Sequence, residues 1–439
     1  MTLKILRHLL ATLLCIGCVC LTSQTVQASE FDSSESDFYY EYENENENFY
    51  SSITAPWIRE TYEASYTLDK NGETRLTWNE SYFNSDSEIL YEVEFGSKED
   101  FSDAITYTVS EPSLTLSKSA FGENGGKFYF RVRICENGYN YSNWSNPAEV
   151  SYVKINKTNF PGLYKLLKKG GKQMKFDGGY DTYTYDSNGD GWLDPYEIYN
   201  IWGLFTASVK KTKGSKIYYE PHVKVSSLKG VEHLTNLSSI SLYQYSETRI
   251  DCSDNPRINS IWVSGITSKQ ITVISPTAKT VSVEPTYENK NFTKINLLKC
   301  PNAHTITAYG NNGTPKLTLP KVKTALRELS VSDLGMKTLD LNSYTNLQLL
   351  YVYNSDITNL KVNKCTDLRY LYFYYCSKIK SLDLTKNKKL IGFATVSAPG
   401  LTEKTVKGYK NADKAIFNSK NGKFWYGTDK YNELKQSFQ

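Results

Sequence analysis

Two stretches near the C-terminal end of the chain alternate aliphatic or aromatic side chains with tyrosines at a period of two. They read LLYVYNS at residues 349–355 and YLYFYYC at residues 370–376, and they begin 21 residues apart. Successive side chains of a β-strand point to opposite faces of its sheet. Each stretch is therefore predicted to be a strand with one apolar face and one face of phenol rings.

The same pattern recurs in a weaker form from residue 228 onward. Hydrophobic residues that open equivalent segments follow one another at intervals of 21, 24, 22, 22, 21 and 22 residues, namely Ile250, Ile271, Ile295, Leu317, Leu339, Leu360 and Leu382. This period and the spacing L-x-x-L-x-L-x-x-N/C-x-L are typical of leucine-rich repeats. The spacing is clearest over residues 347–357 and 368–379. We predict a solenoid in which each repeat gives one strand to a parallel sheet.

The outward positions of these strands form the first candidate site. In a leucine-rich repeat solenoid the leucine-type positions stack inside, and the positions between them face outward on the concave side. Those outward positions mix small hydroxyl side chains with aromatic rings, namely Tyr243, Trp262, Tyr309, Tyr351, Tyr353, Tyr372 and Tyr374. Such a mixture is typical of recognition surfaces. An alternative stays open, because tyrosine is a good strand former and the chain contains 35 of them.

A second repeated position holds short polar or thiol side chains. Cys300 and Cys365 occupy the position that Asn255 and Asn387 occupy in other repeats. A small buried polar group there can satisfy the backbone of the adjoining loop. We predict that these thiols are structural.

The pattern is different over residues 53–153. Short alternating segments such as TRLTW, ILYEVEFG and KFYFRVRI are separated by clusters of Asn, Asp and Gly, which predicts a β-sandwich of about 100 residues. Trp78 and the segments YEVEFG, FRVR and NWSNPAEV resemble a fibronectin type III domain. Phe128 departs from that family, because it stands where a tyrosine usually bonds the backbone. The resemblance implies a spacer, with direct ligand binding as the alternative.

The twelve residues DSNGDGWLDPYE match the EF-hand calcium loop at each key position. Oxygen ligands would come from Asp186, Asn188, Asp190, the Trp192 carbonyl, Asp194 and Glu197, with Gly191 at the turn. Carboxylates gathered so densely repel one another unless a cation lies among them, which favours Ca²⁺. A metal-free Asp-Asn-Gly turn is the alternative. The chain contains a single such loop, so we expect calcium to stabilise the structure.

The flanks of the loop indicate an unusual EF-hand. A helix is expected to leave through residues 194–205, whereas paired glycines at 170–171 and 178–179 interrupt the approach and place the incoming helix near residues 161–169. The order of INKTNFP, the loop, VSSLKGVEHLTNL and the repeats resembles secreted bacterial leucine-rich repeat proteins over residues 155–403. The resemblance implies a calcium-stabilised cap before the solenoid.

The termini and cysteines indicate an exported protein. Lys4 and Arg7 precede an apolar run at residues 9–21, and small residues follow at Val26 and Ala28, which is typical of a secretory signal peptide cleaved after Ala28. Residues 30–52 contain eight acidic residues and no basic one, whereas residues 404–439 contain eight Lys and three acidic residues. These are expected to be solvated ends. Five cysteines remain after cleavage, at spacings that fit no disulfide framework or zinc site.

No catalytic motif accompanies this organisation. G-x-S-x-G, H-E-x-x-H, phosphate-loop and dinucleotide patterns are absent from the sequence, and dispersed lysines give no nucleic-acid signature. We expect a non-enzymatic, exported, monomeric protein without a membrane span, which binds an extracellular protein or glycan through the concave tyrosines. A carbohydrate-degrading accessory protein or enzyme and a calcium-gated signalling protein are the alternatives.

The fold class predicted is mostly β and multidomain: a fibronectin type III-like sandwich, an EF-hand-like helix-loop-helix cap and a leucine-rich repeat solenoid with a parallel β-sheet. The expected boundaries are a signal peptide at 1–28, a disordered acidic segment at 29–52, the sandwich at 53–153, the cap at 154–210, the repeats at 211–403 and a C-terminal cap or Lys-rich tail at 404–439.

Overall fold

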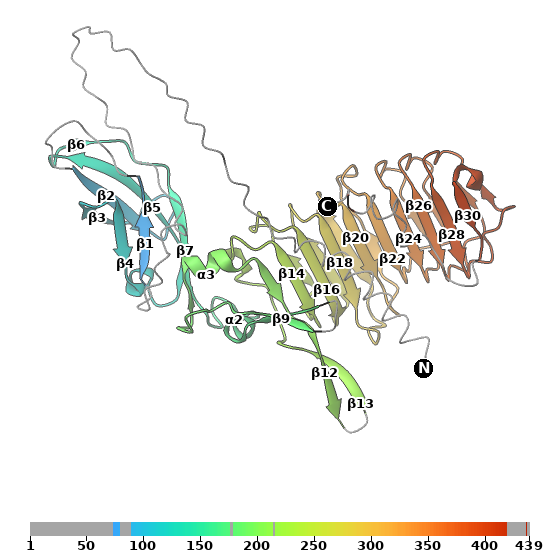
Figure 1. Ribbon diagram of the computed structural model, residues 1–439, viewed down its shortest axis with the longest axis horizontal. Coiled ribbons are helices and arrows are strands. Elements are labelled where there is room, and N and C mark those ends of the chain that lie inside the picture. The colour runs from blue at the N-terminus through green and yellow to red at the C-terminus, as the bar shows by residue number, and fades with distance from the viewer. Residues whose placement is uncertain (1–72, 80–88, 176–178, 214–215, 419–435, 437–439) are drawn as a thin grey trace, which may run out of the picture.

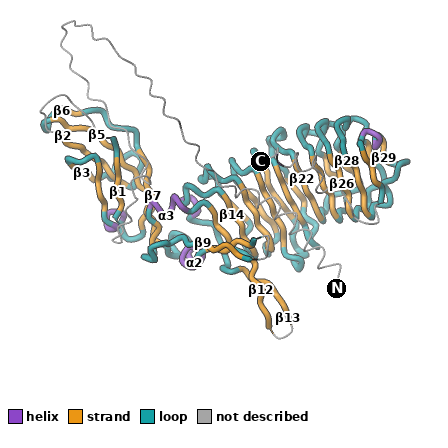
Figure 2. The backbone as a smooth tube through the Cα atoms, viewed as in Figure 1, coloured by secondary structure: helices purple, strands orange, loops and turns teal. Residues whose placement is uncertain are grey.

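The computed structural model describes residues 73–79, 89–175, 179–213, 216–418 and 436 (Figure 1). The predicted signal peptide, the acidic segment at 29–52, the first twenty residues of the predicted sandwich and most of the Lys-rich tail lie outside these residues. Within the described part of the chain, no helix is both long enough and apolar enough to cross a membrane. Strands and loops dominate the structure, as Figure 2 shows, which confirms the mostly β prediction.

The N-terminal part of the described chain is an antiparallel β-sandwich. One sheet pairs β1 with β4, and the other has the order β10-β7-β5-β2-β3, with β6 on β5 and with β10 (Trp192–Leu193) contributed by the region that follows. Alternate side chains from both sheets bury a core that includes Trp78, Val93, Phe130 and Tyr152. The elements are β1 (Thr74–Thr77), β2 (Ile89–Gly96), β3 (Ile105–Val109), β4 (Ser113–Leu116), η2 (Lys118–Phe121), β5 (Gly125–Glu136), β6 (Asn140–Tyr141) and β7 (Ala148–Lys154).

A connecting region of short elements follows the sandwich. Its elements are α2 (Tyr164–Lys169), β8 (Gly171–Met174), β9 (Tyr180–Tyr183), β10 (Trp192–Leu193), α3 (Pro195–Asn200), β11 (Gly203–Phe205), β12 (Ser208–Lys213) and β13 (Lys216–Pro221). The β12–β13 hairpin projects away from the body of the molecule (Figure 1). The strand β11 already pairs in parallel with β14, so the long sheet of the solenoid begins within this region.

The solenoid has two strands in most of its turns. The first strands form one ten-stranded parallel sheet with the order β11-β14-β16-β18-β20-β22-β24-β26-β28-β30. Its further members are β14 (Ser239–Tyr243), β16 (Ser260–Ile266), β18 (Thr280–Pro285), β20 (Thr305–Tyr309), β22 (Glu328–Ser332), β24 (Leu349–Tyr353), β26 (Tyr370–Tyr374), β28 (Gly392–Val396) and β30 (Lys414–Ile416), with the turn η3 (Val231–His233) before them.

The second strands cover the opposite side of the core in shorter sheets. They are β15 (Arg249–Asp251), β17 (Gln270–Ile274), β19 (Lys294–Lys299), β21 (Lys316–Thr318), β23 (Thr338–Asp340), β25 (Asn359–Lys361), β27 (Leu382–Asp383) and β29 (Val406–Lys407), with η4 (Tyr409–Asn411) near the end. Each hydrophobic residue from which the repeat interval was counted lies in one of these strands. The predicted parallel solenoid is confirmed, and the sequence reading missed the strand β18.

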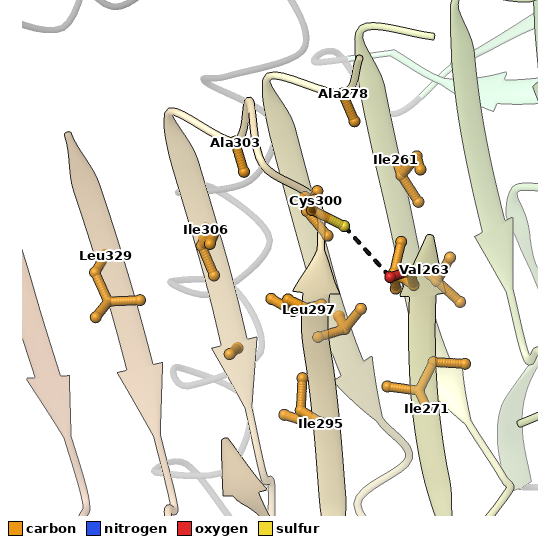
Figure 3. Packing of buried hydrophobic residues seen from close by; sticks show 14 of the residues in the cluster. Ile261, Val263, Ile271, Ala278, Ile295, Leu297, Cys300, Ala303, Ile306 and Leu329 are labelled. Carbon is orange, nitrogen blue, oxygen red and sulfur yellow. Dashed lines mark hydrogen bonds between the residues drawn. The ribbon is translucent and has the colours of Figure 1, made fainter. Parts of the chain in front are cut away.

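One continuous apolar core fills the space between the two sets of strands. Figure 3 shows its layers, with Ile261, Ile306 and Leu329 from the long sheet facing Ile271 and Ile295 from the short one. Burial of aliphatic side chains stabilises a structure by roughly 25 cal/mol per Å² of apolar surface. Because each turn buries its apolar edge only against its neighbours, the core depends on stacking along the whole solenoid.

The repeated thiol and amide position lies at the corners of the solenoid. Cys300 Sγ donates to the carbonyl oxygen of Val273 over 3.4 Å, and Cys365 Sγ donates to that of Leu341 over 3.1 Å (Figure 3 draws the first). Asn387 Nδ2 reaches the carbonyl oxygens of Val362 and Cys365 at 3.0 and 2.8 Å. All five cysteines of the described residues are buried and free, so the structural role predicted for Cys300 and Cys365 is confirmed.

Candidate functional sites

The outer face of the ten-stranded sheet carries the aromatic residues predicted from the repeats. We call this surface the tyrosine face, defined by the outward side chains of β14, β16, β18, β20, β22, β24, β26 and β28. The inward neighbours Leu350, Val352, Leu371 and Phe373 belong to the solenoid core. Tyr351 and Tyr372 instead belong to a separate cluster on the outer side, which confirms the two-sided pattern read from the sequence.

Strand register arranges the tyrosine face in columns. The middle column follows paired residues without interruption and contains Ser241, Trp262, Ser282, Thr307, Ser330, Tyr351, Tyr372 and Ala394. The end column pairs Tyr243 with Ser264, is interrupted by a bulge after Val263, and resumes as Tyr309, Ser332, Tyr353, Tyr374 and Val396. All seven aromatic residues predicted to face outward therefore lie in these two columns, and the strand β18 adds Ser282 to the middle one.

The rings stack on one another along these columns. The centroids of Tyr351 and Tyr372 lie 5.0 Å apart with nearly parallel planes, and those of Tyr353 and Tyr374 lie 4.8 Å apart. These distances approximate the spacing of neighbouring strands, because in-register residues repeat with each strand. The stacked rings occupy each other's faces, which leaves ring edges and hydroxyl groups as the groups that a ligand can meet.

Burial of the outward rings varies within both columns. Tyr351 and Tyr372 of the middle column are 2% and 0% exposed, and Tyr309 of the end column is 6% exposed. We expected all outward rings to be open surface, and for these three that expectation is wrong. The reading overlooked a third outward column, in which Leu349 and Tyr370 pack beside the rings of the middle column. Tyr243, Trp262, Tyr353 and Tyr374 are only half-buried.

Hydrogen bonds and burial also change the chemistry of the phenols. The hydroxyl groups of Tyr309 and Ser330 lie 3.1 Å apart and share a hydrogen bond. Burial raises the pKa of Tyr374 and of Tyr243 above the ordinary value of a phenol. These groups therefore stay neutral at physiological pH and act as hydrogen-bond donors and acceptors rather than as charges.

A row of strained residues borders the end column. We call it the left-handed ridge: Gln244, Gly265, Asp333, Asn354, Tyr375 and Ser397 each follow the last outward residue of a strand in the long sheet and have positive φ, between 37° and 65°. The ridge amides continue the ladder, as when Asn354 N donates to the Tyr374 carbonyl oxygen. Left-handed backbone is unfavourable for residues other than glycine, and most of all for a bulky residue such as Tyr375.

The ridge is the part of the candidate site that the sequence reading missed. Strained conformations persist where the surrounding structure enforces them, and they cluster at functional sites. Tyr375 is 44% exposed, and the side chains of Asp333 and Asn354 bond one another. The polar residues that directly follow each predicted strand were the available signal, because Asn and Asp tolerate this backbone better than most residues do.

The second candidate site is the acidic loop, residues 186–197, between β9 and α3. Carboxylate and amide oxygens bond the backbone of the loop itself: Asp186 accepts from Gly191 N at 3.1 Å, Asn188 from Asp190 N at 2.9 Å, and Asp190 from Trp192 N at 2.8 Å. Gly189 and Gly191 have φ of 73° and 80°, which glycine adopts without strain. The loop thus curls its oxygen-bearing side chains toward the inside of the turn.

Its exit is a short capped helix. Asp194 caps α3 by accepting from Glu197 N at 2.8 Å, and Glu197 accepts in return from Asp194 N at 3.3 Å. At the entry, α2 lies where the short incoming helix was predicted, Gly170 ends it, and the β8–β9 hairpin separates it from the loop. The exit helix is shorter than predicted over 194–205, because α3 ends at Asn200 and residues 203–205 form β11.

Two carboxylates of the acidic loop, Asp194 and Glu197, are buried, whereas Asp186 is half-buried and Asp190 is exposed. Glu197 is 2% exposed and accepts at one oxygen from Ser187 N, Ser187 Oγ and Asn188 N. Burial, and next the neighbouring Asp194, raise the pKa of Glu197 to about 7. Burial also raises the pKa values of Asp186 and Asp194. The one ion pair that the described structure gives the loop joins Lys118 to Asp190 at 2.5 Å.

These residues fit a calcium ion in their chemistry. One oxygen of Asp186 is buried and has no hydrogen-bond partner, and the donors are all hard oxygens. Among the described residues, no three Asp, Glu, His or Cys side chains are grouped closely enough to hold a metal ion in this structure. Asp186, Asn188, Asp190, the Trp192 carbonyl, Asp194 and Glu197 are the residues that would hold the ion.

No protein-family model matches the chain, and no curated protein matches it. A solved structure of the functional domain of InlJ from Listeria monocytogenes, described as including a cysteine ladder, is similar at 13% identity and a TM-score of 0.21. The match covers 58% of this chain and 63% of that one.

Proposed function

We propose that this chain is an exported, calcium-stabilised binding protein that recognises an extracellular protein or glycan through its tyrosine face. The observation that carries the proposal is the part of the end column in which Ser332, Tyr353 and Tyr374 pair in register, with both tyrosines half-buried, beside the left-handed ridge. Tyrosine and serine combine a rigid amphipathic contact with adaptable hydrogen bonding. Nothing in the described site supplies a nucleophile and base within reach of each other, and we propose binding rather than catalysis.

The geometry of the columns favours an extended ligand. Equivalent residues repeat about every 4.8 Å along the solenoid, because each strand contributes one member to each column. A polymer that lies across the strands meets the same kind of group again and again. Because the ring faces are occupied by neighbouring rings, the ligand hydrogen-bonds to phenol edges and serine hydroxyls, which suits a glycan or an extended polypeptide.

Calcium has a structural part in this proposal. The acidic loop directly precedes α3 and β11, and β11 begins the ten-stranded sheet. A cation among Asp186, Asp194 and Glu197 would offset the repulsion of buried carboxylates and favour the folded protein by mass action. The sandwich, with its fibronectin type III-like sequence, would act as a spacer, and the leucine-rich repeats as the recognition unit.

The experiment applies the mature chain, residues 29–439, to a glycan array and to a panel of immobilised extracellular proteins. Three forms are compared: wild type, the double variant Tyr353→Ala with Tyr374→Ala, and Thr338→Ala, which alters an exposed residue on the opposite sheet. The proposal expects a wild-type signal that the double variant loses and the control keeps. Equal signals from all three forms would show that the tyrosine face is not the site.

A further inference from the structure

A two-stranded ladder links the sandwich to the solenoid at the acidic loop. Trp192 and Leu193, at the seventh and eighth positions of the loop, form β10 and pair antiparallel with Lys154 and Val153 of β7. The last strand of the sandwich is therefore paired with a segment of the predicted calcium loop.

Side chains of this ladder alternate between two hydrophobic cores. Tyr152 and Trp192 belong to the core of the sandwich, whereas Val153 and Leu193 belong to the core of the solenoid. All four are at most 8% exposed. Because neighbouring residues of a strand point to opposite sides, the pair β7–β10 is one wall shared by both cores.

The sandwich is shaped to receive Trp192. Its ring lies 5.5 Å from that of Tyr152, which itself stacks on Phe121 at 4.6 Å. A methyl group on Gly125 would lie 2.0 Å from the Tyr152 carbonyl oxygen and 3.0 Å from the Trp192 ring. Glycine at this position, with φ of 65°, thus gives the ring and the backbone room to approach.

Polar contacts also join the sandwich to the acidic loop and to the residues that follow β7. Lys118 of the sandwich pairs with Asp190 of the loop and lies 5.5 Å from the centre of the Trp192 ring. Ile155 N donates to the Gly191 carbonyl oxygen at 2.8 Å, so the turn glycine of the loop bonds the chain that leaves the sandwich. Asn159 Nδ2 bridges the carbonyl oxygens of Asn124 and Lys154 at 2.7 and 2.9 Å.

We infer that the acidic loop is a joint whose occupancy by calcium couples the sandwich to the solenoid. The inference rests on the calcium binding of the proposed function. An ion held by residues 186–197 orders β10, and an ordered β10 holds Trp192 in one core and Leu193 in the other. Coupling between two sites is reciprocal, so docking of the sandwich also strengthens calcium binding by the loop.

The test uses calorimetry on the mature chain, residues 29–439, with calcium and with a chelator. In calcium, the sandwich and the solenoid unfold in one transition, and in chelator they separate into two. Trp192→Ala keeps the ligand carbonyl but removes the contact with the sandwich. This variant unfolds in two transitions even in calcium, and its dissociation constant for calcium is higher than that of wild type by about fivefold or more.

Trp202→Ala is the matched control, because Trp202 packs on Tyr183 and Phe205 rather than on the sandwich. It keeps the single transition and the wild-type calcium affinity. Calcium binding without any change in the number or spacing of transitions overturns the joint and leaves the calcium site standing. Absence of calcium binding in wild type overturns both. A single transition in Trp192→Ala at a lower temperature also overturns the joint.

Discussion

The acidic loop and the tyrosine face assemble their polar groups in opposite ways. The loop takes its oxygens from twelve consecutive residues, so a short stretch of backbone sets their positions. The face takes each ring from a different strand about 21 residues along the chain, and only strand register sets the spacing. The first site depends on local turns and on charge, and the second depends on the packing of the whole solenoid.

This difference predicts which variants affect stability and which affect binding. The alternation along β24 and β26 separates a core side from a recognition side in the same few residues. The loop has no such separation, because its carboxylates both cap α3 and would hold the ion. Variants of inward residues of a strand should therefore change stability, and variants of outward residues should change ligand binding. Variants in the loop should change stability and calcium binding together.

The largest effect is expected from an inward residue of the tyrosine strands. Leu371 is fully buried in the solenoid core, so Leu371→Ala should lower the free energy of unfolding by about 2 to 5 kcal/mol. Chemical denaturation of the mature chain measures this loss. Tyr353→Ala, on the outward side of the preceding strand, is the control. A smaller loss for Leu371→Ala than for Tyr353→Ala would invert the assignment of the two sides.

A pH dependence is expected next, from Glu197. Its folded pKa of about 7 exceeds the ordinary value of 4.5, so the folded calcium-free protein retains a proton that the unfolded chain has lost between these values. Stability without calcium should therefore fall as pH rises from about 5 to 7.5, by on the order of 2 kcal/mol. Melting temperatures in chelator measure this fall.

Two comparisons sharpen the pH experiment. Glu197→Gln removes the titrating group and should flatten the fall in chelator, and saturating calcium should largely abolish it in wild type because the ion stabilises the ionised carboxylate. The same variant should weaken calcium binding, which is expected at a dissociation constant of about 0.1 to 1 mM in wild type. A melting temperature that rises with pH in chelator would contradict the burial of this carboxylate.

A moderate effect is expected from the stacked ring of Tyr372. It is fully buried and lies 5.0 Å from Tyr351, so Tyr372→Ala should cost about 1 to 2 kcal/mol of stability, more than an ordinary surface site. Tyr372→Phe keeps the ring and should stay within about 0.5 kcal/mol of wild type. Denaturant midpoints test the pair. Equal losses in both variants would mean that the hydroxyl group, and not stacking, stabilises the column.

The smallest effect on stability is expected at the ridge. Tyr375 adopts a φ of 50°, and glycine relieves that strain while it increases the entropy of the unfolded chain, so Tyr375→Gly should change stability by less than about 1 kcal/mol. Binding to whichever array ligand wild type retains should nevertheless fall, because the exposed ring borders the end column. Thermal melts beside array signals measure both properties. A large loss of stability would make the ridge a structural element only.

The solenoid was predictable from sequence because its period and alternation are repeated many times. Ile271 pairs with Ile295, and Ile295 pairs with Leu317, as the repeat spacing requires. Tyr351 and Tyr353 pair in the same way with Tyr372 and Tyr374. The missed strand at Thr280–Pro285 lies within the longest repeat interval, the 24 residues from Ile271 to Ile295. The burial of Tyr351 and Tyr372 was missed because it depends on the third column, which the two-column prediction did not include.

The acidic loop was predictable in identity but not in context. The order of Asp186, Asn188 and Asp190 is a local signal, and the capping of α3 by Asp194 follows from the same short segment. The loop motif does not predict that Trp192 packs in the sandwich core, because this contact depends on Tyr152 and Gly125, which are distant in the sequence. Non-local packing was the missing information in both sites.

Recognition through the tyrosine face is tested most directly by the affinity of Tyr374→Ala for the strongest ligand identified on the arrays, measured by surface plasmon resonance with calcium present. We expect a dissociation constant at least about thirtyfold higher than that of wild type, which corresponds to about 2 kcal/mol, with a single unfolding transition retained. An unchanged dissociation constant, with Thr338→Ala and wild type binding equally well, would contradict recognition through the tyrosine face.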